Sequence, residues 1–439
     1  MMRLASGHKG MGLQGIRRTA AIPECWGLHG VHQSRIHEIH SVRVQRVEMT
    51  KMEDSKPLVR IEDGGINIHR PLLGFSKSSL KATCLHYRIR WIEDATNSDP
   101  TATTRNAIRH LLHHRDLPLA LRKTSLLSIA DRMHKKAIDR WASADNFFRG
   151  CHILIFDARS GGLAVRLPDR VLQRQFQFIP LEYRERNIFL AQYKASLLLR
   201  RLIEIVTPQE VVALENLRFS VNAMFPELEN PNAVEVDKGL AASNFTVAGV
   251  SFKRFHSPLR DPEGTDKLKN RQEHLDWKYI WLLARQPYAS TQELPTITIP
   301  PLPEPVTSCP VDIAPDPSPP TLSNPYSPWH LWDGRFWLRV SNSTPSSLVI
   351  RPLCGKDLKP FRMALARAQR QHFDDLLSGA APGKVRWTLP VLARTDGTVI
   401  AVPTLGTALD EAVVGGKVRW EVRFRKVDLG ARREEVAVR

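Results

Sequence analysis

Residues Arg70 to His110 read RPLLGFSKSSLKATCLHYRIRWIEDATNSDPTATTRNAIRH. Ser76 is a typical N-cap residue, and it precedes Lys77 to His86, which has the apolar spacing of a short helix. The chain then reads as extended through Arg88 to Trp91 and as turn-rich through Asp94 to Thr104. The stretch therefore predicts a helix, an extended segment, a polar loop and the start of a second helix.

The polar loop contains the residues that we single out as a candidate site. Asp94 and Asn97 are turn formers whose side chains bond nearby backbone amides. Arg105, Asn106 and Arg109 follow at a spacing that suits anchoring of the loop to the next helix. Taken alone, these residue types favour a structural role over a chemical one.

Length and order change that balance. Trp91 to His110 resembles the WVEDPTN…RNxIRH signature of tRNA(Ile)-lysidine synthases, which are PP-loop ATPases, and Arg70 to Lys77 resembles their RPLL segment at the expected distance. Near the N-terminus, residues of the family's glycine-rich RLLRGSGLRGLAGM run are matched by Arg3, Leu4, Gly7, Gly12, Leu13 and Gly15. Residues 25–34, CWGLHGVHQS, look more like the fungal form of the family than the bacterial one. Residues 1–23 contain no Asp or Glu and also have the composition of a mitochondrial transit peptide. The match to the glycine-rich run is the stronger interpretation.

The resemblance implies an α/β fold, ATP with Mg²⁺ as cofactor, and tRNA(Ile) and lysine as further partners. In the family, an SGGxDS loop binds the pyrophosphate of ATP and an HHxDDQxET helix supplies carboxylates. Neither sequence precedes Arg70 here, so we expect a chain shortened at its N-terminus, through a shortened gene model or a real truncation. Ser160-Gly161-Gly162 contains SGG, but Ala164 and Val165 stand where that loop needs Asp and Ser, so a hairpin turn explains it.

Charge and composition bound the remaining classes. The 63 Lys and Arg against 45 Asp and Glu give a net charge of +18, which favours a polyanionic partner such as RNA, although a merely cationic organellar protein stays open. The five cysteines are far apart and the histidine clusters show no HExxH pattern, so we expect no metal site. No apolar run approaches the roughly 20 residues of a membrane span.

Along the chain we expect four regions: 1–115, the C-terminal part of a PP-loop ligase domain; 116–293, a mainly helical middle region with a β-hairpin; 294–328, a proline-rich linker; and 329–439, a β-rich domain. The middle region should hold helices at 119–148, 187–206 and 208–217, the hairpin 153–156/163–167, and strands at 245–255 and 279–283.

In the last region we expect strands at 336–340, 347–352, 385–389, 399–402 and 417–427, with one helix at 358–377. In the final strand, Val418, Trp420, Val422 and Phe424 alternate with charged residues. Its Arg419, Arg423 and Arg425, together with Lys426, suit phosphate contact.

Two functions follow from these patterns. The first is a lysidine-synthase-like ligase that attaches lysine to the wobble cytidine of tRNA(Ile), with Arg3, Gly7, Asp94, Asn97, Arg105, Asn106 and Arg109 shaping the active-site wall or contacting tRNA or nucleotide. The second is a non-catalytic, basic tRNA-binding protein derived from that family; a proline-linker scaffold is a weaker third. The family's role in organellar decoding implies a mitochondrial site, with a cytoplasmic one left open. The sequence leaves the oligomeric state undetermined.

Overall fold

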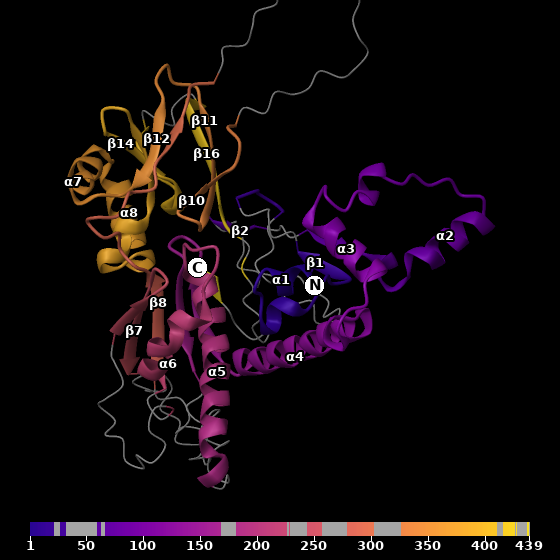
Figure 1. Cartoon of the computed structure of the whole chain (residues 1–439). Coiled ribbons are helices and arrows are strands. Elements are labelled where there is room, and N and C mark those ends of the chain that lie inside the picture. Colours follow the sequence, from indigo (N-terminus) through magenta and orange to yellow (C-terminus); the bar gives the residue numbers. More distant parts are fainter. Residues whose placement is uncertain are drawn as a thin grey trace, which may run out of the picture. The chain divides into compact units, whose positions relative to one another are not determined.

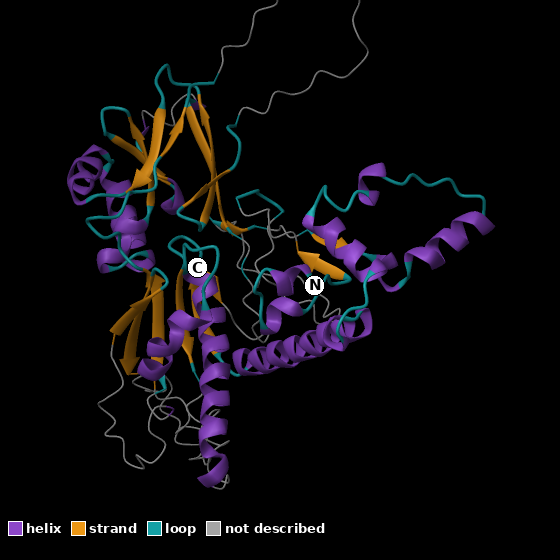
Figure 2. Cartoon of the chain, viewed as in Figure 1, coloured by secondary structure: helices purple, strands orange, loops and turns teal. Residues whose placement is uncertain are grey.

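The computed structural model describes residues 1–21, 27–31, 59–62, 66–167, 181–225, 228, 244–256, 279–302, 326–410, 416–425, 427 and 437–438. The chain divides into two compact units (Figure 1). Unit 1 comprises residues 1–22, 35–45 and 66–145, and unit 2 comprises residues 23–34, 46–65 and 146–439. Most of the strands belong to unit 2 (Figure 2).

Unit 1 is built of short elements joined by loops. In chain order they are α1 (Met2–Ala5), η1 (Gly10–Leu13), β1 (Thr19–Ala21), β3 (Asn67–His69), η3 (Pro71–Gly74), α2 (Lys77–His86), η4 (Ala95–Ser98), α3 (Thr104–His114), η5 (Leu119–Leu121) and most of α4 (Lys123–Arg149). β1 and β3 pair antiparallel, with Thr19 opposite His69. The expected helix 77–86 is confirmed, and its N-cap Ser76 accepts a hydrogen bond from the Ser79 amide at 3.1 Å.

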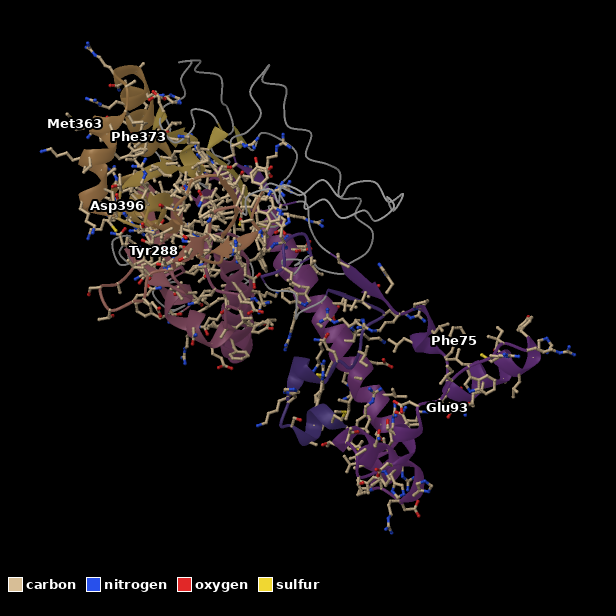
Figure 3. All side chains as sticks on the ribbon, turned by 90° about the horizontal axis from the view of Figure 1, so that it is seen from above. Phe75, Glu93, Tyr288, Met363, Phe373 and Asp396 are labelled. Carbon is tan, nitrogen blue, oxygen red and sulfur yellow. The ribbon has the colours of Figure 1, made fainter. Side chains whose placement is uncertain are left out.

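Unit 1 buries little apolar surface among its described residues. Its buried apolar side chains are Ala137 and Ala144, both on α4, and α2 has no buried residue. Phe75, Tyr87 and Ile92 are all exposed. In Figure 3, Phe75 lies on a thinly populated part of the ribbon, whereas the side chains around Phe373 in unit 2 are crowded. The hydrophobic contribution to stability, which scales with buried apolar area, is therefore small in unit 1.

The middle of unit 2 is a six-stranded sheet with helices. Its strand order is β17-β4-β5-β8-β7-β6. The elements are β4 (His152–Asp157), β5 (Gly162–Arg166), α5 (Leu181–Val206), η7 (Leu214–Leu217), α6 (Arg218–Met224), β6 (Asn244–Val247), β7 (Val250–His256), β8 (Tyr279–Arg285) and β17 (Ala437–Val438). α5 packs on β5 and β8. The expected hairpin is confirmed, but this region also contributes the other strands of a sheet, which exceeds the mainly helical layout that we expected.

Two expectations in this region are wrong. The helix predicted for 208–217 does not form, because the Thr207 hydroxyl donates to the Ala248 carbonyl at 2.5 Å and helix begins only at Leu214. The strand predicted for 245–255 is two strands, because Ala248 and Gly249 both have positive φ and reverse the chain between β6 and β7.

The C-terminal part of unit 2 contains two further sheets. The four-stranded sheet has the order β10-β11-β16-β2 and the five-stranded sheet has the order β15-β14-β13-β12-β9. The elements are β2 (Arg60–Ile61), β9 (Ile297–Ile299), β10 (His330–Trp332), β11 (Phe336–Asn342), β12 (Leu348–Pro352), α7 (Gly355–Ala364), α8 (Arg367–Ala380), η9 (Gly383–Thr388), β13 (Pro390–Arg394), β14 (Val399–Val402), η10 (Pro403–Leu405), β15 (Thr407–Ala408) and β16 (Val418–Phe424).

Each face of the five-stranded sheet is covered. Leu392 of β13 joins the main core with Phe336 and Leu338 of the other sheet. Its neighbours Val391 and Ala393 point to a second core that α7 and α8 supply. Alternate residues of one strand thus enter two different cores, as the period of a strand requires.

Several C-terminal expectations need correction. The single helix predicted for 358–377 is two helices, α7 and α8, separated by Leu365 and Ala366. The strand predicted for 385–389 is the 3-10 helix η9, and the strand begins at Pro390. The linker predicted for 294–328 contains β9, which pairs with β12, while residues 303–325 lie outside the described residues.

A buried arginine network fixes unit 2 internally. Asp333 receives hydrogen bonds from the guanidinium groups of Arg285, at 3.1 Å, and Arg335, at 2.8 Å. Arg335 is fully buried and also donates to the backbone carbonyls of Ser160 and Thr388. The network therefore joins the β4–β5 turn to the C-terminal sheets. Among the described helices, none has the length and apolarity needed to cross a membrane.

Candidate functional site

The candidate loop begins with a local carboxylate turn. Asp94 is the N-cap of η4, and its Oδ1 accepts from the Thr96 amide at 2.9 Å and the Thr96 hydroxyl at 2.7 Å. These two hydrogen bonds lower the pKa of the exposed Asp94 carboxyl. Asp99 repeats the arrangement with Thr101, at 2.8 and 2.6 Å. Both carboxylates therefore shape the loop.

Asn106 fixes this loop on α3. It is 7% exposed and is the one buried polar residue among the described part of unit 1. Its Nδ2 donates to the carbonyls of Thr96, at 2.8 Å, and Asp99, at 3.0 Å. Its own amide donates to the hydroxyl of the N-cap Thr103 at 3.1 Å. Because both side-chain protons are used on backbone, Asn106 is a positioning residue.

The two arginines of the candidate set lie one turn apart on α3, and both are exposed. Arg109 donates to Asn97 Oδ1 at 2.9 Å, which fixes its guanidinium beside the loop. Arg105 forms no hydrogen bond or ion pair with the residues that the structure describes. Residues four apart share a helix face, so this face presents one oriented and one free guanidinium group.

Sequence reasoning missed Glu93 and its two lysines. The Glu93 carboxylate receives Lys81 Nζ at 2.5 Å and Lys77 Nζ at 3.3 Å, with the Trp91 indole at 3.4 Å. Hydrogen bonds from Lys81 and Lys77 lower the pKa of Glu93 to about 2. Glu93 lies immediately before the loop (Figure 3). Its ion pairs with Lys77 and Lys81 therefore connect α2 to the segment that leads into the loop. The spacing of Lys77 and Lys81, one turn apart on a helix, was the available signal.

The N-terminal candidates form a separate turn. Arg3 Nη1 donates to the Gly12 carbonyl at 2.8 Å, and α1 lies against α3. Gly7 has φ +75°, a conformation that glycine adopts readily. Both residues hold the glycine-rich segment in shape, and among the residues that the structure describes no hydrogen bond joins them to the loop at Asp94.

The SGG sequence of this chain does not form a polyphosphate loop. Ser160-Gly161-Gly162 is a buried hairpin turn, and a Cβ on Gly161 would lie 2.8 Å from the Phe424 ring. Within the described ranges, no three His, Cys, Asp or Glu side chains gather as metal ligands, and the rings of His110 and His114 lie 4.5 Å apart.

The expectation that the arginines of the last strand are available for phosphate contact is partly wrong. Arg419 of β16 is exposed and Arg423 is half-buried, but Arg425 is 5% exposed and donates to the Glu204 carbonyl at 2.6 Å. Burial lowers the pKa of Arg425 to about 10. Arg425 is therefore structural, and Lys426 lies outside the described residues.

Comparison with known proteins agrees with the sequence motifs. Residues 1–115 match the model of a family described as a PP-loop domain. The chain is also 25% identical over 344 residues to a protein of Schizosaccharomyces pombe named "Probable tRNA(Ile)-lysidine synthase". That likeness covers 78% of this chain and 58% of the relative, so the chain spans less than two thirds of the relative's length.

The family match falls on the residues of the glycine-rich run and the WIEDATN…RNAIRH stretch, and the likeness to the yeast protein continues well beyond them. Residues 1–115 therefore carry the match to a PP-loop domain, and the chain as a whole is similar to a probable tRNA(Ile)-lysidine synthase.

Proposed function

We propose that the chain serves in the ATP-dependent attachment of lysine to the wobble cytidine of tRNA(Ile), as a tRNA-binding body of such a ligase. The observation that carries this proposal is the loop Asp94–Thr101, fixed on α3 by Asn106 and flanked by exposed Arg105 and Arg109. It lies within the residues that match the PP-loop domain. The net charge of +18 supports a polyanionic substrate.

The side chains of this loop divide into positioning and contact roles. Asn106, Asp94 and Asn97 hold the loop and orient Arg109, because their hydrogen bonds are made within the protein. Arg105 and Arg109 then supply charge to a phosphate or a base edge, for which guanidinium groups are well suited. In this proposal tRNA(Ile) is the partner that this chain contacts, and lysine and ATP are the other reactants of the reaction in which it serves.

The ligand that the present residues do not accommodate is ATP. SGGxDS and HHxDDQxET do not occur in the 439 residues, and the one SGG sequence forms a buried turn. We therefore propose that this chain does not hold ATP in the family's manner. Isothermal titration of the purified polypeptide with ATP and Mg²⁺ should give no saturable heat. A tight, stoichiometric isotherm would contradict this part of the proposal.

A filter-binding comparison tests the contact role. The Arg105→Gln and Arg109→Gln variants should each weaken binding of a tRNA(Ile) transcript and lower the salt slope by about one. Lys123→Gln, which removes one exposed charge from the start of α4 in the same unit, is the matched control and should change little. Equal effects from all three variants would show that only overall charge matters and that the loop is not a contact site.

A further inference from the structure

The connection between β1 and β3 leaves unit 1 and contributes to unit 2. Residues 27–31 and 59–62 of this connection belong to unit 2, although β1 and β3 are paired in unit 1. β2 pairs parallel with β16 at the edge of the four-stranded sheet, with Ile61 opposite Phe424. The preceding Val59 is buried in the main core. The connection is therefore built into the C-terminal sheet as an added strand.

A buried carboxylate anchors the connection. Glu62 is 2% exposed, its amide donates to the Phe424 carbonyl at 2.7 Å, and its Oε2 accepts from the Trp337 indole at 2.8 Å. Its Oε1 accepts from the Gly30 amide. Glu62 thus holds the two described parts of the connection to the same strand, β11.

Trp337 shows that the connection covers a face of the sheet. Phe336 and Leu338 of β11 point into the main core, and Trp337 between them points to the opposite face. Trp337 is nevertheless only 1% exposed. His29 contacts it edge-on at 5.3 Å, so the connection closes an otherwise outward-facing aromatic position.

On the same side an aromatic ring is stacked among cations. The His29 imidazole lies parallel to the Trp329 indole, at 4.2 Å between centroids and 10° between planes. The guanidinium groups of Arg339 and Arg423 lie over the Trp329 ring at 4.7 and 5.2 Å. Arg339 also lies over the Tyr326 ring at 4.8 Å. The Trp329 ring thus stacks with a flat heterocycle and also contacts two guanidinium groups, and aromatic rings and guanidinium planes are the groups on which proteins stack unpaired nucleobases.

The charges around this ring suit a polyanion. Arg339 is paired with Glu421 at 2.8 Å, but Arg423 has no carboxylate within ion-pair distance among the described residues. Arg60, opposite Arg423 in the β2–β16 register, is exposed, as is Arg419 further along β16. Arg60 and Arg419 thus add exposed cationic groups on the strand pair that carries Arg423, and such groups attract the phosphates of a nucleic acid.

We propose that the Trp329 ring is a stacking site for one unpaired base of an RNA, and that His29 is a displaceable plug occupying the place of that base. The proposal rests on the proposed function for its choice of RNA. Glu62 and β2 remain as the anchor, while residues 27–31 move aside. An aromatic pair contributes roughly 2- to 12-fold to an equilibrium and a base stacked on an aromatic side chain roughly 5- to 150-fold, so a base can replace the imidazole.

The test is fluorescence anisotropy of the full chain with a labelled octaadenylate, an RNA without base pairs. His29→Ala should tighten binding about three- to tenfold, because no plug has to leave. Trp329→Ala should weaken it at least tenfold, and Trp329→Phe should restore most of the loss. His372→Ala, an exposed histidine of α8 in the same unit, is the matched control and should bind like the wild type.

Two further measurements distinguish failure of the stacking site from failure of the proposed function. A blunt RNA duplex should be bound equally by all variants, and octaadenylate should speed hydrogen exchange in residues 27–31. Unchanged or weaker binding by His29→Ala, or full binding by Trp329→Ala, would overturn the stacking site. If the variants fail in this way while tRNA(Ile) is still retained, the proposed function stands; if no RNA of any kind is bound, both proposals fall.

Discussion

Units 1 and 2 use similar sequence signals to different ends. In unit 1, α2 is capped by Ser76 and the loop Asp94–Thr101 is closed by side-chain hydrogen bonds, yet the buried apolar residues among those described are two alanines. In unit 2, Phe336 and Trp332 are fully buried in a core shared by three sheets. Local hydrogen bonding thus sets the form of unit 1, whereas packing sets that of unit 2.

The difference has a physical consequence. Capping and loop hydrogen bonds contribute about 1 kcal/mol each, whereas full burial of a large apolar side chain contributes about 1.5 to 3 kcal/mol. Exposed apolar residues in unit 1, such as Phe75 and Trp91, form a surface that would gain free energy from being covered. We therefore expect the two units to differ in stability.

The largest expected effect compares one core residue with one surface residue. Phe336→Ala should lower the free energy of unfolding of unit 2 by about 3 to 5 kcal/mol, because it leaves a cavity in a well-packed core. Leu85→Ala on the exposed side of α2 should change stability by less than about 0.5 kcal/mol. Urea unfolding followed by hydrogen exchange of each unit measures both. A similar loss for both variants would remove the distinction between the units.

The buried arginine network should come next. Asp333→Asn keeps a residue that tolerates the positive φ of this position but removes the charge that Arg285 and Arg335 share. We expect a loss of about 3 kcal/mol, since two buried guanidinium groups lose their carboxylate. The exposed Asp396→Asn is the control, with little change expected. Thermal unfolding of the two variants gives the comparison, and equal melting temperatures would mean that the network is not a stabilising feature.

In unit 1 the matching experiment is Asn106→Ala. The carbonyls of Thr96 and Asp99 would lose their donor, at a cost of about 1 to 3 kcal/mol confined to the loop. Hydrogen exchange should rise in residues 94–101 and remain unchanged in β11 and β16. Filter binding of tRNA(Ile) should weaken along with it, because Arg109 loses its fixed partner. Undisturbed exchange in the loop would show that Asn106 does not position it.

The smallest effect concerns pH. Burial lowers the pKa of His29, with Arg423 and Arg339 acting in the same direction and Glu62 and Glu421 opposing them. Stacking therefore favours the neutral imidazole, and protonation of His29 opposes the stacked position. The stacking of His29 on Trp329 should be fully present above about pH 6.5, the ordinary pKa of histidine. It should weaken as the pH falls below that value. The difference in octaadenylate affinity between wild type and His29→Ala should narrow by less than tenfold between pH 7.5 and 5.5. A constant difference across this range would contradict the direction of the shift.

The elements that sequence predicts well are those with local causes. Ser76 and the apolar spacing after it give α2, and the alternation around Val422 gives β16. Pro208 and Thr207 carry the same helix-start signals, but the Thr207 hydroxyl bonds Ala248, 41 positions away, and no helix forms there. The alternation of apolar and charged residues predicts that Arg425 is exposed. It is buried instead, and its guanidinium donates a hydrogen bond to the Glu204 carbonyl. Long-range partners of this kind leave no local pattern.

The candidate site divides in the same way. The turn-forming role of Asp94 and the anchoring role of Asn106 follow from residue type and spacing, and the structure bears out both as positions in a loop. The docking of His29 on Trp329 joins residues 300 positions apart and could not be read from either segment. The assignment of individual side chains to nucleotide or tRNA contact stays a prediction.

The most direct test of the proposal that this chain binds tRNA(Ile) is a salt titration of binding between the purified 439-residue polypeptide and a tRNA(Ile) transcript. We predict retention on filters at 50 mM salt and a steep loss of affinity on raising the salt to 200 mM, as release of counterions from several phosphate contacts requires. Absence of binding at low salt, or an affinity that salt does not change, would contradict the account.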